Sequence, residues 1–186
     1  PDELRGKRVA IPGKLTTAAL LLRLFDPDIE ELIVMSFDEI MPAAERGEVD
    51  AGLIIHESRF TYPRHGLVKV IDLGEWWEES TGHPIPLGGI LARRALGAEL
   101  IGRIDRALRE SVEFAYAHPE EVRGYIREHA QEMEDEVMRA HIDLYVNEYT
   151  LDYGAAGAAA IVDLLERAVS AGIVPESGMP LFVENA

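Results

Sequence analysis

The chain contains no cysteine, which excludes disulfide bonds, thiolate metal ligands and a cysteine nucleophile. It also lacks any apolar run near the ~20 residues of a membrane-spanning helix, and it shows no signal-peptide pattern. From these absences we expect a cytoplasmic protein with no membrane partner. The sequence opens at Pro1 without an initiator methionine and enters a strand by Arg8, which leaves room for a missing upstream segment.

Basic residues are scarce relative to acidic ones. Lys and Arg number 18 against 34 Asp and Glu, so the formal net charge is −16. Nucleic-acid binding needs a basic surface, so we expect no nucleic-acid partner. A small anionic ligand is still allowed, because salt limits the reach of surface charge to roughly 8–10 Å. Solubility is the simplest interpretation of the acidity.

The first half alternates short apolar runs with amphipathic stretches, which is the pattern of an α/β fold with a mainly parallel sheet. The expected strands are 8–12, 31–35, 51–56, 67–72 and 87–92, and the expected helices are 16–25 and 37–46. The segment GEWWEESTGHPIP is expected to be a loop between the last two strands. Its Trp76 and Trp77 are interpreted as core anchors, the alternative being that one contacts a ligand ring.

The second half changes to helices alone. Amphipathic helices are expected at 99–117, from 118–119 onward, at 132–146 and at 155–171, with no strand after residue 94. We therefore expect an α/β lobe over residues 1–94 and a helical segment over residues 95–186. Helices without strands must bury their apolar stripes on one another or on another structure.

His56 is the first candidate functional residue. It ends the apolar run 51–55, and the polar residues Glu57, Ser58 and Arg59 follow it. Ligands of open α/β sheets bind beyond the carboxyl ends of the strands. An imidazole there, with an ordinary pKa of about 6.5, can exchange a proton near neutral pH. The alternative is a histidine satisfied inside the core, and the polar residues favour the site.

No metal site is expected around His56. The zinc motif H-E-x-x-H needs a second histidine at the position of Phe60, and the other histidines show no ligand spacing.

Thr16 and Thr17 are the second candidate site. They follow the turn Pro12–Gly13 and open the helix 16–25. The free N–H groups of a helix start bind carboxylate or phosphate, and threonine hydroxyls add donors. Ordinary N-capping by threonine is the alternative. A phosphate-binding P-loop is excluded, because Gly6 and Gly13 are too far apart for its motif and Leu15 follows Lys14.

Several long segments together resemble one family. These segments are GLIIHESRFTY, GLVKVIDLGEWWEESTGHPIPLGGILARR, HPEEVRGYIREHA and YVNEYTLDYG. They are similar to the 1,4-dihydroxy-6-naphthoate synthases of the futalosine route to menaquinone, in the same order and with similar spacing, from about Arg8 to Val183. The second segment, with its paired tryptophans and PLGG turn, is the most specific.

The resemblance implies an α/β fold of the periplasmic-binding-protein-like (type II) class, with two lobes. It implies a carbon–carbon lyase that releases 1,4-dihydroxy-6-naphthoate from cyclic dehypoxanthinyl futalosine, with neither a metal nor an organic cofactor. The general base of the family falls on His56. The threonine pair that holds a carboxylate-type ligand falls on Thr16 and Thr17.

The resemblance also implies that one lobe is incomplete. Family members carry an additional N-terminal segment, and the helices after residue 94 would belong mostly to the lobe that it helps to build. We therefore expect an N-terminal lobe or partner chain that is absent here. Two other functions stay open: a chorismate dehydratase-like lyase of the same pathway, and a non-catalytic protein that binds small carboxylates.

Overall fold

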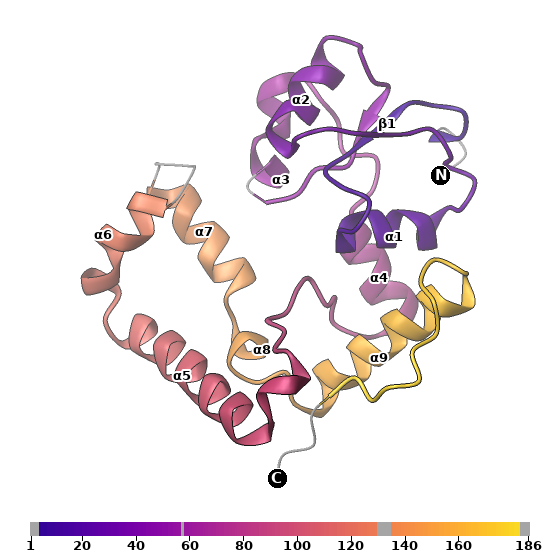
Figure 1. The fold of residues 1–186 in the computed structure, drawn as a ribbon. Coiled ribbons are helices and arrows are strands. Elements are labelled where there is room, and N and C mark those ends of the chain that lie inside the picture. Colours follow the sequence, from indigo (N-terminus) through magenta and orange to yellow (C-terminus); the bar gives the residue numbers. More distant parts are fainter. Residues whose placement is uncertain (1–3, 57, 130–134, 183–186) are drawn as a thin grey trace. The chain divides into compact units, whose positions relative to one another are not determined.

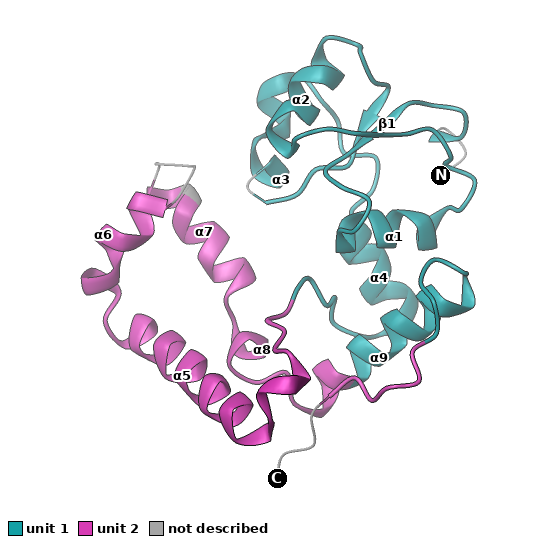
Figure 2. Ribbon diagram, in the orientation of Figure 1, with its two compact units in different colours: residues 1–88, 159–176 teal, residues 89–158, 177–186 magenta. Residues whose placement is uncertain are grey.

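The structure is a computed structural model that describes residues 4–56, 58–129 and 135–182. The chain divides into two compact units (Figure 2). Unit 1 comprises residues 1–88 and 159–176, and unit 2 comprises residues 89–158 and 177–186. None of the described helices is long and apolar enough to cross a membrane.

Unit 1 contains a small parallel sheet in the order β2-β1-β3, of which β1 is labelled in Figure 1. The strands are β1 (Val9–Ile11), β2 (Leu32–Val34) and β3 (Ala51–Gly52). They lie within the first three ranges expected from the sequence. The third is shorter than expected, since its last ladder bond runs from the Leu53 N–H to the Ala10 carbonyl at 2.8 Å.

Helices cover both faces of this sheet. Because successive strand residues point to opposite faces, Val9 and Ile11 lie on one side and Ala10 on the other. Val9 and Ile11 pack in a core cluster with Leu21, Trp77 and Leu164. Ala10 packs with Ile40, Ala43 and Val49 on the opposite face. The helices involved are α1 (Thr17–Phe25), α4 (Leu73–Thr81) and α9 (Gly154–Ser170) on the first side, and α2 (Phe37–Glu45) on the second.

The expected loop 74–86 is wrong in its first part, because α4 begins at Leu73. The Asp72 carboxylate accepts hydrogen bonds from the N–H groups of Gly74 and Glu75 at 2.9 and 3.2 Å. Gly82, with φ of 72°, ends the helix in the left-handed conformation. Trp77 is fully buried, so core packing is confirmed for that tryptophan.

The expected strands 67–72 and 87–92 are also absent from the described sheet. All residues of both segments lie outside any helix or strand. A strand needs a partner for its backbone groups, and no described strand pairs with either segment. Short α3 (Ser58–Thr61) and a 3₁₀ turn (Tyr62–His65) precede the first of them.

Unit 2 is helical. It contains a 3₁₀ turn (Arg94–Leu96), α5 (Ala98–Ala117), α6 (Pro119–His129), α7 (Asp135–Tyr145), α8 (Glu148–Leu151) and the first residues of α9. Short α8, capped by Asn147, was not expected. Residues of α9 from 159 onward count with unit 1, because Ala160, Leu164 and Ala168 are buried. The expected assignment of residues 95–186 to another lobe stays a prediction.

Asp50 and Arg8 join the start of β1 to the turn before β3, and their pairing predicts a defined acid response. Arg8 donates from Nε and Nη2 to the two Asp50 carboxylate oxygens, both at 3.1 Å. These bonds lower the pKa of Asp50 from its ordinary 3.8 to about 2. Since the folded-state pKa is the lower one, the stabilisation is present above about pH 4 and is lost as pH falls toward 2.

We therefore expect Asp50→Asn to lower the urea midpoint at pH 6, and we expect the gap from the parent chain to close between pH 4 and pH 2. Glu75→Gln is the matched control, because Glu75 forms an exposed ion pair with Lys69 at 3.2 Å. A gap of equal size at pH 6 and pH 2 would contradict the assignment.

Candidate functional site

The candidate residues lie along one edge of the sheet in unit 1. The carboxyl ends of parallel strands share an edge, and ligands bind beyond it. Thr16 and Thr17 follow β1, Phe37 begins the helix after β2, and His56 follows β3. The order β2-β1-β3 thus brings these residues to the same edge. Glu57 lies outside the described residues.

His56 has an unusual backbone. Its φ is 57°, and among the described residues it is the one non-glycine residue with a positive φ. Such a conformation costs of order 1–3 kcal/mol and persists where surrounding structure imposes it. The side chain is exposed, so the structure does not place His56 in the core. Its ring meets the Phe37 ring edge-on, with centroids 5.3 Å apart and planes at 74°.

Phe37 is a neighbour of His56 that the sequence interpretation missed. It is the first residue of α2, directly after Ser36 at the N-cap. Its place was available from the sequence, because the start of a helix that follows a parallel strand lies at the carboxyl edge. The half-buried Phe37 ring contacts the imidazole edge-on and so limits the positions open to it.

Thr16 caps α1. Its hydroxyl oxygen accepts from the Ala19 N–H at 3.1 Å and donates to the Gly13 carbonyl at 3.0 Å. The hydroxyl is thus used inside the protein, as the capping alternative requires. The N–H groups of Thr17 and Ala18 have no intrahelical acceptor, because they belong to the first turn. These N–H groups can donate hydrogen bonds to an anion at this edge, and the positive end of the helix dipole favours its negative charge.

Thr17 makes a long-range contact. Its hydroxyl donates to the Leu87 carbonyl at 2.9 Å, which ties the start of α1 to the segment before Gly88 and Gly89. Unit 1 ends at Gly88. The bond therefore holds Leu87, the second residue of the PLGG segment, next to the N–H groups at the start of α1.

We expect Thr17→Val to lower the free energy of unfolding of the chain by about 0.5–1.5 kcal/mol, which is the net contribution of a typical hydrogen bond. Thr17→Ser keeps the hydroxyl and serves as the control, with a free energy of unfolding close to that of the parent chain. Urea unfolding followed by tryptophan fluorescence measures both. Equal free energies in the valine and serine variants would show that the bond does not hold this segment.

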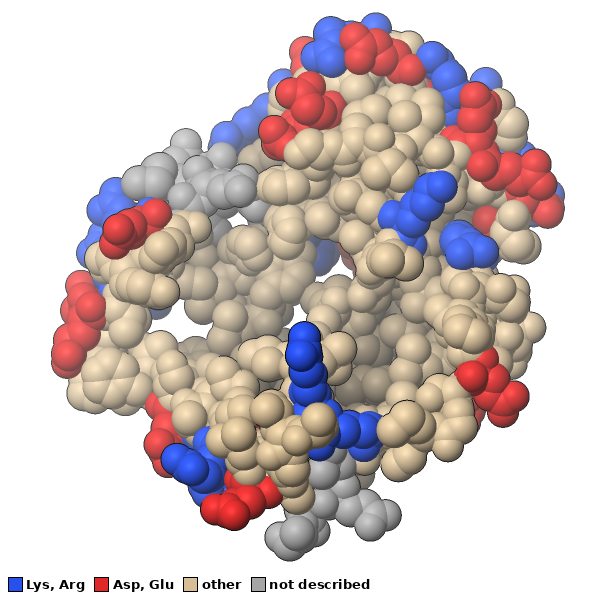
Figure 3. Space-filling model, in the orientation of Figure 1, with Lys and Arg blue, Asp and Glu red and all other residues tan. Residues whose placement is uncertain are grey.

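Arg59, a charged residue near this edge, is paired with a carboxylate. Arg59 donates to the Asp72 carboxylate at 3.1 Å and so joins α3 to the N-cap of α4. Within the described residues, no group of three or more His, Asp or Glu side chains lies close enough to hold a metal ion. On the face drawn in Figure 3, Lys and Arg side chains lie scattered among Asp and Glu instead of forming a continuous basic patch.

Comparison with known proteins places these residues in a family. A model of the family described as menaquinone biosynthesis matches residues 1–170. The 1,4-dihydroxy-6-naphthoate synthase of Thermus thermophilus is 54% identical over 180 residues, which cover 97% of this chain and 66% of that protein. The protein of the same name from Streptomyces coelicolor is 53% identical, with 95% of this chain and 64% of that protein covered.

A solved structure is also similar. The crystal structure of a protein from Archaeoglobus fulgidus superposes on this chain with a TM-score of 0.86 at 41% sequence identity. The match covers 92% of this chain and 64% of the Archaeoglobus fulgidus chain. The chain thus spans slightly less than two thirds of the length of these relatives. The family match extends over most of the chain, and the chain belongs to the menaquinone biosynthesis family.

Proposed function

We propose that this chain carries the proton-transfer site of a 1,4-dihydroxy-6-naphthoate synthase, a carbon–carbon lyase that acts on cyclic dehypoxanthinyl futalosine. The observation that carries the proposal is the exposed imidazole of His56 at the carboxyl edge of the sheet, in a chain 54% identical to a protein of that name. Because the chain spans only part of that relative, the activity of the whole protein is a proposal here.

In this proposal neutral His56 removes a proton from the bound cyclic substrate. The electron pair left on the substrate forms a π bond in the ring system, and a carbon–carbon bond of the substrate breaks. The pair of the broken bond leaves with the remaining fragment of the substrate, which takes the proton back from His56 as the naphthoate becomes aromatic. Aromatisation supplies driving force, so the protein has mainly to orient the substrate and accept the proton. General base catalysis of this kind contributes typically 10²–10⁴-fold. The contact between Phe37 and His56 supports a fixed direction for that transfer.

Thr16 and Thr17 are the proposed substrate-binding residues. Since their hydroxyls bond to Gly13, Ala19 and Leu87, we propose that the N–H groups at the start of α1 hold the substrate carboxylate. The hydroxyls then position those N–H groups. No metal or organic cofactor enters this scheme.

We also propose the periplasmic-binding-protein-like two-lobe architecture, with unit 1 as one lobe and unit 2 as part of an incomplete second one. Its support is the β2-β1-β3 parallel order with helices on both faces of the sheet. The partner in this proposal is an N-terminal lobe or a separate chain that completes the second lobe. A cytoplasmic location stays a prediction.

The test is an assay of the chain, alone and with the missing third of the Thermus thermophilus relative supplied as a separate polypeptide. Formation of 1,4-dihydroxy-6-naphthoate from cyclic dehypoxanthinyl futalosine in either preparation is the expected result. Turnover of chorismate instead would favour the dehydratase-like alternative. Binding of the naphthoate without turnover of either substrate would favour a carboxylate-binding protein.

A further inference from the structure

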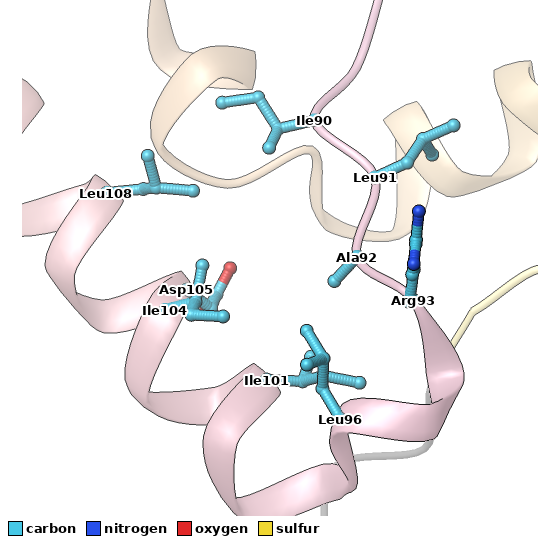
Figure 4. A pocket seen from close by; sticks show the side chains of 9 residues that line it. All are labelled: Ile90, Leu91, Ala92, Arg93, Leu96, Ile101, Ile104, Asp105 and Leu108. Carbon is cyan, nitrogen blue, oxygen red and sulfur yellow. The ribbon is translucent and has the colours of Figure 1, made fainter.

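A pocket in unit 2 is lined mainly by apolar side chains. It has a volume of about 310 Å³ and lies between the segment 90–96 and α5. Its lining is apolar apart from Arg93 and Asp105 (Figure 4), and none of these lining residues ordinarily titrates near neutral pH. The edge of the sheet in unit 1, by contrast, carries an imidazole in a costly backbone conformation.

The conformation of His56 has to be imposed by its neighbours. Its φ of 57° is costly for a residue with a side chain, and such residues persist where the surrounding structure holds them. Before His56, the bond from the Leu53 N–H to the Ala10 carbonyl at 2.8 Å holds β3 to β1. After His56, the Arg59 N–H donates to the His56 carbonyl at 3.5 Å, which is longer than the usual distance of about 2.9–3.0 Å. This backbone bond is weak, so the chain after His56 needs a further restraint.

The Arg59 side chain supplies such a restraint. Its Nη2 donates to Asp72 Oδ2 at 3.1 Å, across 13 positions of the sequence. Its guanidinium carbon also lies 5.8 Å from the centroid of the Phe60 ring, within the range of a cation–π contact. Because Arg59 is the second residue of α3, the bond to Asp72 ties this short helix to the start of α4.

Asp72 is a rigid anchor for Arg59. Its Oδ1 accepts hydrogen bonds from two N–H groups in the first turn of α4 at 2.9 and 3.2 Å, while its Oδ2 accepts from Arg59. One carboxylate oxygen thus caps α4, and the other holds the guanidinium. Helix α4 is fixed in turn by Trp77, which is fully buried in a core cluster. The chain after His56 is therefore connected to the core through Arg59 and Asp72.

The pair of Arg59 and Asp72 acts on the position of His56 more than on global stability. The two side chains are 40% and 22% exposed, and ion pairs that solvent reaches contribute little to the free energy of unfolding. The local effect is different, because the pair acts directly after a residue with a strained backbone. The His56 ring meets the Phe37 ring at 5.3 Å between centroids. Release of the chain after His56 would let the imidazole leave this contact.

We propose that Arg59 is a positioning residue for His56, and that its bond to Asp72 keeps the imidazole against Phe37 and directed at the substrate. This role rests on the proposed function, in which His56 is the general base. Arg59 itself neither binds the substrate nor moves a proton. A displacement of about 1 Å from the reacting geometry can cost roughly a hundredfold in rate, so loss of the guanidinium lowers kcat and leaves KM nearly unchanged.

The first test is kinetic and uses the active preparation. Arg59→Met keeps the apolar stem and removes the guanidinium, and it should lower kcat roughly tenfold to a hundredfold with KM within about twofold of the parent value. Asp72→Asn should act in the same way, because asparagine still caps a helix but turns an amide toward Arg59 in place of the second carboxylate oxygen. Arg59→Lys keeps a cationic donor and should recover part of the lost kcat.

Arg46→Met is the matched control for Arg59→Met. Arg46 forms an exposed ion pair with Glu48 at 2.8 Å and lies at the opposite end of α2 from Phe37, so the same chemical change falls away from the site. We expect its kcat to stay within about twofold of the parent value. Urea unfolding should place the midpoints of Arg59→Met and Asp72→Asn close to that of the parent chain.

The second test does not depend on turnover. Nuclear Overhauser contacts between the ring protons of His56 and Phe37 are measured by NMR in the 186-residue chain. We expect these contacts in the parent chain and in Arg46→Met, and we expect them to weaken in Arg59→Met and Asp72→Asn. A weaker contact with an unchanged urea midpoint is the signature of a lost positioning role.

Ring contacts that persist in Arg59→Met overturn the proposal, as do equal values of kcat in Arg59→Met and Arg46→Met. A higher KM with kcat retained would make Arg59 a substrate-binding group and overturns it too. A kcat that falls together with the urea midpoint, without recovery in Arg59→Lys, assigns the pair to the fold alone. If no preparation turns over the substrate, the proposed function is refuted, and weaker ring contacts still support the positioning of His56.

Discussion

Replacing His56 with asparagine is expected to lower kcat for the cyclic substrate at least a hundredfold and to leave naphthoate affinity nearly unchanged. Asparagine cannot accept a proton at neutral pH, and removal of a general base costs typically 10²–10⁴-fold. Asparagine also tolerates positive φ better than most residues, so the backbone at φ 57° is retained. Steady-state kinetics and product titration in the active preparation measure the two quantities.

His65→Asn is the matched control for His56→Asn. His65 lies in the same unit, and its Nδ1 is 2.8 Å from the Glu45 carboxylate, so the chemical change is the same at a site without a proposed role in proton transfer. We expect its kcat to stay within about twofold of the parent chain. Retention of a tenth or more of the activity by His56→Asn would remove the general-base assignment.

A glycine variant separates chemistry from structure at the same position. Glycine adopts φ of 57° without strain, and the exposed His56 position leaves space for free imidazole. His56→Gly should therefore lose activity, and added imidazole should restore part of it. If His56 acts only through the fold, imidazole restores nothing.

The first part of the fold follows from local signals. The run Val9–Ile11 is apolar, a turn follows at Gly13, and Thr16 has the residue type of an N-cap. Gly47, with φ of 69°, stands just after the end of α2, where a left-handed residue is common. These signals act over a few residues, so a sequence alone predicts them.

Helix α4 could have been predicted from the same kind of signal. Asp72 is a strong N-cap residue and Gly82 a typical C-terminal one, and they bracket Leu73–Thr81. The paired tryptophans and the glycine and proline residues nearby favoured a loop instead. In this segment the capping residues indicate the helix correctly, whereas the amino-acid composition indicates a loop and is wrong.

The predicted strands 67–72 and 87–92 failed for a different reason. An apolar, β-branched run can pair only where another strand presents its backbone groups, and that depends on distant residues. In unit 1 the Leu87 carbonyl bonds to Thr17, which is 70 positions away in the sequence. No local pattern predicts such a bond.

The candidate site was predictable in position but not in detail. Strand order and helix starts place His56, Thr16 and Thr17 at one edge, as the sequence indicated. The left-handed backbone of His56, its contact with Phe37 and the bonds of the threonine hydroxyls depend on packing between elements. The catalytic and binding roles themselves stay predictions until variants are measured.

Trp77→Ala is expected to cost about 3–5 kcal/mol of the free energy of unfolding of unit 1, as large-to-small changes at buried aromatic residues do. Trp77 is fully buried in the cluster that contains Val9 and Leu164. Its indole N–H donates to the Pro84 carbonyl at 3.3 Å, and the Arg167 guanidinium lies 5.7 Å from the ring centroid. Removing the indole would leave a cavity between α4, α9 and the sheet, and these elements would lose the contacts that Trp77 makes.

Trp76 provides the control one position away. It is half-buried and meets Phe25 edge-on, with ring centroids 5.4 Å apart, so Trp76→Ala should cost only about 1–2 kcal/mol. The chain has just these two tryptophans, so each variant keeps one indole whose fluorescence reports urea unfolding. Should Trp77→Ala fail to fold, Trp77→Phe fills most of the cavity and loses the bond to Pro84, which places its midpoint between those of the parent and the alanine variant. Equal losses for Trp76→Ala and Trp77→Ala would mean that Trp77 does not anchor α4 in the core. The sheet edge that carries His56 would then need another support.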